Sequence, residues 1–91
     1  MKVVASPQFL KKVKKFPKQE RMDIDAQIHR ICDNPALGEE KKQDLKGVFV
    51  HKFKLAKREV LVAYASTEDT IYLITIGGHE NYYRDLKRYL E

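Results

Sequence analysis

The sequence lacks a second cysteine, a long apolar run and an export signal. Cys32 is the only cysteine in 91 residues, so no intramolecular disulfide can form, and its apolar helical setting predicts a packed thiol. No apolar run approaches the ~20 residues of a membrane span. The beginning, MKVVASPQFL, has no apolar core of the kind found in signal peptides. We therefore expect a cytoplasmic protein that makes no use of a membrane.

Signatures of metal and cofactor enzymes are also missing. The chain contains no CxxC, HExxH or paired-aspartate pattern, so no metal site is predicted. It contains no P-loop, GxGxxG motif or serine-hydrolase elbow, which leaves nucleotide-cofactor and acyl-transfer enzymes without support. The expectation is a protein without a cofactor.

The composition is that of one small folded domain. The chain is 43% hydrophobic, which at this length supports a single modest core, so residues 1–91 are expected to form one domain. Charged residues make up 34% and are mixed in sign, unlike most disordered chains. The net charge of +5 favours a polyanionic partner such as RNA, DNA or an acidic protein segment.

The N-terminal third predicts a strand followed by two helices. The apolar run KVVA at 2–5 is followed by Ser6 and Pro7, which suit the cap and first position of a helix. The helical spacing of apolar residues predicts two core-facing stripes. These are Phe9, Leu10, Val13 and Phe16 in the first helix, and Ile24, Ile28 and Ile31 in a second helix over 18–33.

The rest of the chain predicts a sheet and a final helix. The polar segment 38–46 is expected to be a loop. Three β-rich runs follow, at 48–55, 60–65 and 71–76, linked by AKRE and STEDT, with Gly77 and Gly78 ending the last one. A helix is expected over about 80–90. The order β-α-α-β-β-β-α predicts an α+β fold in which the helical hairpin covers one face of an antiparallel sheet and leaves the other partly open.

The segment from Lys46 to Arg58 carries five cations and no acid. Because strand side chains alternate, Lys52 and Lys54 share a face with Val48 and Val50, and the opposite face carries Phe49, His51, Phe53 and Leu55. If the lysine face is the open one, its ammonium groups can receive phosphates. The alternative is a solvated lysine pair that protects a sheet edge.

The three histidines differ in setting. His51 lies among apolar neighbours, where a core or rim histidine is the usual outcome, and His29 lies beside the isoleucine stripe in a structural or solvated position. His79 follows two glycines that permit close approach of a substrate, and Tyr83 lies one helical turn later. These two residues either share a catalytic pocket or serve as a helix cap and an amphipathic rim residue.

RNA cleavage without a metal requires three kinds of group. A base accepts the proton of the ribose 2′-hydroxyl, cations stabilise the phosphorane, and an acid protonates the leaving 5′-oxygen. The histidines, Tyr83 and the lysines are candidates for these roles.

The segments LKGVFVHKFKLAKREVLVAYA and IYLITIGGHENYYRDLKRYL resemble the sheet and C-terminal helix of RelE/ParE-superfamily toxins. The helical hairpin also fits, so the resemblance covers nearly the whole chain. It implies a RelE-like fold with a curved antiparallel sheet, and a toxin neutralised by a cognate antitoxin. The RelE-like branch cleaves mRNA on the ribosome, and the YafQ-like arrangement pairs a histidine with an aromatic residue one turn later.

By this resemblance, His79 is the general acid or base, Tyr83 stacks on or orients the substrate, and Lys52 and Lys54 stabilise the transition state. The implied RNA-binding residues are Lys46, His51, Lys57, Arg58 and Arg84. Many RelE-like toxins have an arginine in the strand that here reads VLVAY, where this chain has Leu61 and Val62. Lys57, Arg58 or Arg84 is a possible substitute.

Two further readings stay open because of this missing arginine. One is a ParE-like, non-enzymatic inhibitor of DNA gyrase, which has no chemical need for a histidine–aromatic pair. The other is a basic RNA-binding module without catalysis, although the central strands lack the aromatic residues of a stacking platform.

Overall fold

The computed structural model describes residues 1–40 and 47–78, which form two helices and five strands. The predicted helix over 80–90 lies outside the described residues. In chain order the elements are β1 (Lys2–Ala5), α1 (Pro7–Val13), α2 (Lys18–Asp33), β2 (Glu39–Glu40), β3 (Phe49–Leu55), β4 (Arg58–Ser66) and β5 (Thr70–Gly78).

The strands form one mixed sheet in the order β1-β5-β4-β3-β2. The meander of β3, β4 and β5 is antiparallel, as predicted, whereas β1 joins β5 in parallel. The short β2 was expected to be loop. Glu39 and Glu40 pair with Val50 and Phe49 of β3. The prediction missed this strand because two polar residues are too few to show an alternation of apolar and polar side chains.

Two predicted strand ends were wrong. The strand does not break at Gly77; Gly77 and Gly78 are part of β5, where they pair with Leu61 and Val60. The linker between β3 and β4 is not AKRE but the two residues Ala56 and Lys57, with φ of 50° and 69°. Two successive positive φ values suit the tight turn that matches the twist of a hairpin. Sheet pairing therefore overrides the weak strand propensity of glycine and of the charged residues that open β4.

The first helix begins where Ser6 and Pro7 predict. Ser6 Oγ accepts a hydrogen bond from the Phe9 amide at 3.0 Å and donates one to the Ile74 carbonyl at 2.6 Å. This side chain caps α1 and joins it to β5. The second helix covers the predicted range and ends at Asp33, with Asn34 as its C-cap.

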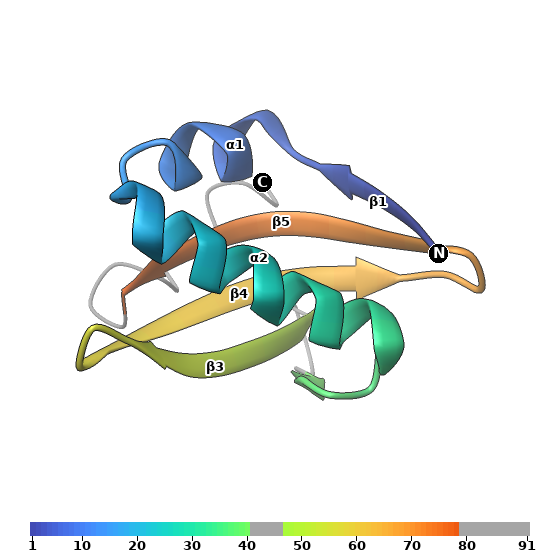
Figure 1. The fold of residues 1–91 in the computed structure, drawn as a ribbon. Coiled ribbons are helices and arrows are strands. Elements are labelled where there is room, and N and C mark those ends of the chain that lie inside the picture. The colour runs from blue at the N-terminus through green and yellow to red at the C-terminus, as the bar shows by residue number, and fades with distance from the viewer. Residues whose placement is uncertain (41–46, 79–91) are drawn as a thin grey trace.

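Both helices lie on one face of the sheet (Figure 1), where they cover the main core. Phe9, Ile24 and Ile31 are buried there, and Ile28 is partly buried. Leu10 was predicted to be in this core but is 53% exposed. The helix α1 is only about two turns long, and it is Phe9 that it directs toward the sheet. The full set of buried members is Phe9, Ile24, Ile31, Leu55, Val60, Val62, Tyr64, Ile71, Leu73 and Ile76.

The other face of the sheet carries a second, smaller cluster. Its buried members are Val48, Val50, Leu61, Ala63 and Ile74. The side chains of β3 divide between the two faces as predicted, since Phe49, Phe53 and Leu55 pack in the helix-side core. The expectation of a partly open face holds where Lys52 and Lys54 are exposed, but the centre of this face is inaccessible to solvent.

Candidate functional site

Lys52 and Lys54 are exposed side chains on the face of β3 that is turned away from the helices. Each has a defined neighbour in β4: Lys52 is opposite Leu61, and Lys54 is opposite Glu59. The sequence showed no acid inside this strand, but it did not show that the adjacent strand places a carboxylate opposite Lys54. Lys52 therefore has an apolar neighbour and Lys54 a charged one.

Two strands away from Lys52 the sheet has a position that no side chain fills. Leu61 pairs with Gly77 in β5, so Lys52, Leu61 and Gly77 form one row across three strands. A Cβ built on Gly77 meets no heavy atom within 4 Å. Two strand spacings place the Gly77 backbone about 10 Å from that of Lys52. The Gly77 position therefore has room for a side chain at the far end of the row that begins at Lys52.

The end of β5 lies level with the two lysines. Gly78 occupies the same row as Phe53, the residue between them, and it directly precedes His79 in the chain. His79, Tyr83, Lys46 and Arg84 themselves lie outside the described residues, so the predicted convergence of His79 and Tyr83 with the lysines stays a prediction.

His51 occupies the opposite side of β3 from the lysines. It is 8% exposed, its ring stacks on Phe53 at 5.5 Å, and Nε2 lies 2.8 Å from Oε1 of Gln27 in α2. Burial, and secondarily the charge of Arg30, lower the pKa of His51 from its ordinary value of 6.5. The expectation of a satisfied rim histidine agrees with these contacts, and an RNA-binding role for His51 finds no support in this position.

The two cations after β3 have different environments. Lys57 is exposed in the β3–β4 turn. The Arg58 guanidinium forms an ion pair with Glu20 of α2 and lies 5.8 Å from the centre of the Phe16 ring. Arg58 therefore has a structural partner on the helix side, whereas Lys57 is turned to solvent.

Leu61 and Val62, the region of β4 where the resemblance implied an arginine, are both closed to solvent. Leu61 and Val62 are each 0% exposed, the first in the second cluster and the second in the main core. A cation at Val62 would be buried among apolar side chains. Among the described strands, the cation paired directly with this point is Lys52, which lies opposite Leu61.

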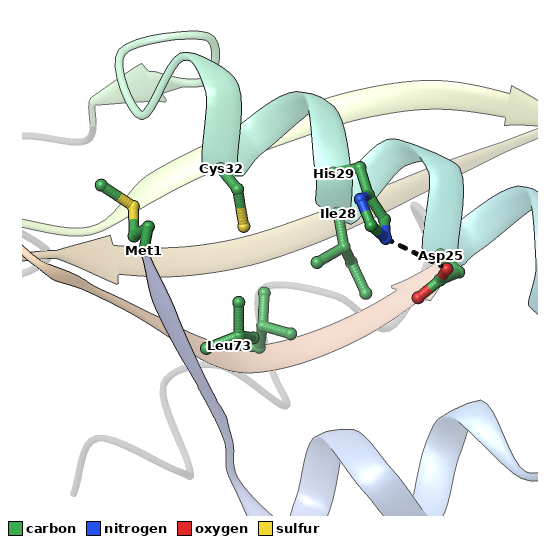
Figure 2. A pocket seen from close by; sticks show the side chains of 7 residues that line it. Met1, Asp25, Ile28, His29, Cys32 and Leu73 are labelled. Atoms are coloured by element: carbon green, nitrogen blue, oxygen red, sulfur yellow. Dashed lines mark ion pairs between the residues drawn. The ribbon is translucent and has the colours of Figure 1, made fainter.

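A separate pocket of about 330 Å³ lies between α2 and the N-terminal strand, away from the lysines (Figure 2). Ile28 and Leu73 supply part of its apolar wall, and the half-buried Cys32 thiol faces it. His29 and Asp25 lie at its rim as an exposed pair 3.4 Å apart. The exposed pair agrees with the structural or solvated position expected for His29. Cys32 packs against the main core but is only partly buried, so its thiol is less enclosed than expected.

Residues 1–40 and 47–78 contain neither a metal-binding cluster nor a membrane-spanning helix. No group of three or more histidine, cysteine, aspartate or glutamate side chains in these ranges is placed to hold a metal ion. No helix in these ranges is long and apolar enough to cross a bilayer.

The fold and the family agree with the resemblance seen in the sequence. A family model for ParE-like toxins of type II bacterial toxin–antitoxin systems matches residues 3–87. The chain therefore belongs to this family, within the RelE/ParE superfamily, and is a type II toxin. No curated protein sequence matched it.

Solved structures share this fold. Free mutant RelE of E. coli has a TM-score of 0.71 at 17% identity, over 96% of this chain and 95% of that one. RelE in the intact E. coli RelBE toxin–antitoxin complex gives 0.69 at 16% identity, over 87% and 96%. The YoeB dimer of Staphylococcus aureus gives 0.69 at 23% identity, over 87% and 97%. At these identities the likeness establishes the α+β, RelE-like fold.

Proposed function

We propose that this toxin is a metal-independent, ribosome-dependent mRNA endonuclease that blocks translation in the cytoplasm. The observation that best supports the proposal is the exposure of Lys52 and Lys54 on one sheet face, two strands away from an open position at Gly77 and level with the strand end that leads to His79. A scissile phosphate above this face would be near two ammonium groups and near the backbone of β5.

In the proposed reaction the ribose 2′-oxygen attacks the adjacent phosphorus. A base removes the 2′-hydroxyl proton, the bond from phosphorus to the 5′-oxygen breaks, and an acid protonates that oxygen, which leaves a 2′,3′-cyclic phosphate and a 5′-hydroxyl. Lys52 and Lys54 stabilise the negative charge on the phosphorane. His79 acts as the acid or base, and Tyr83 stacks on or orients the substrate.

The proposed partner is an antitoxin. The RelE relative of E. coli is held in a RelBE toxin–antitoxin complex and, as a mutant, in a complex with an antitoxin peptide. With a net charge of +5, this chain should attract an acidic antitoxin segment that masks the lysine face. Association should then slow as the salt concentration rises.

The experiment is in vitro cleavage of mRNA on programmed ribosomes, with a gyrase supercoiling assay run in parallel. We expect wild-type protein to cut mRNA in the A site with no metal other than the Mg²⁺ that the ribosomes require, and His79→Ala to lose the cut while keeping its folded circular dichroism spectrum. Inhibition of gyrase with intact mRNA would instead support the ParE-like alternative. Full cleavage by His79→Ala would remove the role assigned to that residue.

A further inference from the structure

A second basic surface lies at one end of the molecule, which carries both the connection between α1 and α2 and the β3–β4 turn. Both segments are at the left end of the view in Figure 1. Lys14, Lys15 and Lys18 are exposed on the connection and at the start of α2, and Lys57 is exposed in the turn. We call these four residues the corner lysines.

The two segments are held together by Arg58. Its guanidinium pairs with Glu20 of α2 and lies over the ring of Phe16, which follows Lys15. These contacts of Arg58 tie the start of β4, directly after Lys57, to the helical connection and to the first turn of α2. Glu20, the first acid after the lysines in the sequence, is already engaged by Arg58.

The corner lysines have no carboxylate partner among the residues that the structure describes. The neighbouring Lys12 is different, because its Nζ donates a hydrogen bond to Thr75 Oγ1 at 3.2 Å. The lysine-rich run thus contains one side chain directed at the sheet and several directed at solvent. Favourable interaction with the C-terminus of α1 is confined to its last turn and cap, which hold Lys11, Lys12 and Lys14, so it does not account for Lys15, Lys18 or Lys57.

We propose that the corner lysines bind the phosphate backbone of double-helical RNA. Ammonium groups contact phosphates without reading bases. Single-stranded RNA is held largely by stacking on aromatic rings. Within the described part of this surface the one aromatic side chain, Phe16, is partly buried and has Arg58 over its ring. A duplex, which presents phosphates and keeps its bases stacked inside, fits this chemistry better than a single strand.

The corner lysines flank the lysine face of β3 without occupying it. Lys57 follows Lys54 by three residues across the turn, while Lys14, Lys15 and Lys18 belong to the helix layer on the other side of the sheet. A duplex bound at the corner would leave Lys52 and Lys54 free for a second strand. The use of this surface to anchor the toxin beside a scissile mRNA rests on the proposed function; duplex binding itself does not.

The test measures binding of a short blunt RNA duplex to the free protein at several salt concentrations. Removal of three phosphate contacts in the variant Lys14→Gln/Lys15→Gln/Lys18→Gln should weaken binding at low salt by roughly tenfold or more and lower the salt slope by about three. The charge-preserving Lys14→Arg/Lys15→Arg/Lys18→Arg should bind like wild type. Lys2→Gln, at an exposed lysine in β1 outside the corner, should change the slope little.

Other outcomes would overturn the proposal. An unchanged salt slope in the triple glutamine variant would exclude the corner as the duplex site, provided that its urea midpoint matches wild type. An equal loss of duplex affinity in Lys2→Gln would show that the effect comes from the net charge of the protein and not from the corner lysines. Stronger binding of polyglutamate or of a single strand than of the duplex would assign the surface to another class of partner. Since no ribosome or cleavage enters this assay, its failure would leave the nuclease proposal untouched.

Discussion

His51 Nε2 lies 2.8 Å from Gln27 Oε1, and this contact joins the strand that carries Lys52 and Lys54 to the helix behind it. The histidine is thus placed to support the lysine strand from the helix side of the sheet. Protonation of His51 should therefore change the folding stability of the protein rather than take part in the cleavage reaction.

Stability should fall as the pH is lowered through the range below 6.5. Burial and the charge of Arg30 lower the pKa of His51 in the folded protein, so the unfolded chain binds the proton more tightly. The corresponding stability is fully present above about 6.5 and is lost as the pH falls toward the lowered pKa. Urea unfolding midpoints at pH 7.5 and 5.5 should differ more for wild type than for His51→Gln. An identical pH dependence in both proteins would contradict this assignment.

The ion pair of Arg58 with Glu20 should contribute modestly to stability. Because the arginine side chain is 57% exposed, we expect Arg58→Gln to cost about 1 kcal/mol, including its contact with Phe16, and a double-mutant cycle with Glu20→Gln to give a coupling of ~0.5 kcal/mol. Arg21→Gln, an exposed arginine of the same helix, is the control. A coupling of zero, with a loss of RNA binding in Arg58→Gln alone, would instead assign Arg58 to RNA.

The Tyr64 hydroxyl should contribute more to folding stability than the ion pair of Arg58 with Glu20. It accepts a hydrogen bond from the Gly38 amide at 2.9 Å and donates one to the Pro35 carbonyl at 2.7 Å, which holds the segment before β2 against the sheet. Tyr64→Phe removes both bonds from a fully buried site and should cost roughly 1–3 kcal/mol. Tyr72→Phe, at an exposed tyrosine, should change stability by less than about 0.5 kcal/mol. Equal effects in calorimetry would show that the Tyr64 contacts are dispensable.

Much of this fold was predictable because its signals are local. Ser6 and Pro7 predicted the start of α1, the isoleucine spacing predicted the buried side of α2, and alternation along β3 separated Lys52 from His51. The errors came from pairing between distant segments. Gly77 and Gly78 are strand residues because β4 pairs with them, and Glu39 with Glu40 is a strand because β3 lies alongside.

The candidate site was predictable only in part, for the same reason. The lysine pair follows from strand parity, which the sequence shows directly. The carboxylate of Glu59 opposite Lys54, the amide of Gln27 beside His51 and the carboxylate of Glu20 beside Arg58 come from other elements. Which of these groups meet depends on strand register and helix packing, and neither has a signature in a single stretch of sequence.

The chemistry of cleavage should depend on the substrate 2′-hydroxyl. An mRNA with one 2′-deoxynucleotide on the 5′ side of the scissile phosphate should resist the toxin, because the attacking oxygen is missing. The same mRNA with the 2′-deoxynucleotide far from the A site should be cut normally. Mass spectrometry of the unmodified product should show a 2′,3′-cyclic phosphate, with EDTA present at a level the ribosomes tolerate. A 5′-phosphate product would point to attack by water and contradict the proposed reaction.

The most direct test of the lysine face is the single-turnover rate of mRNA cleavage on ribosomes by Lys52→Gln/Lys54→Gln. Both side chains are exposed, so the variant should unfold at the wild-type urea midpoint within about 0.5 kcal/mol. We expect its cleavage rate to fall by about 10²-fold or more, as for the loss of other groups that stabilise transition-state charge, while Lys2→Gln cuts at the wild-type rate. A folded double variant that cleaves as fast as wild type would contradict the account.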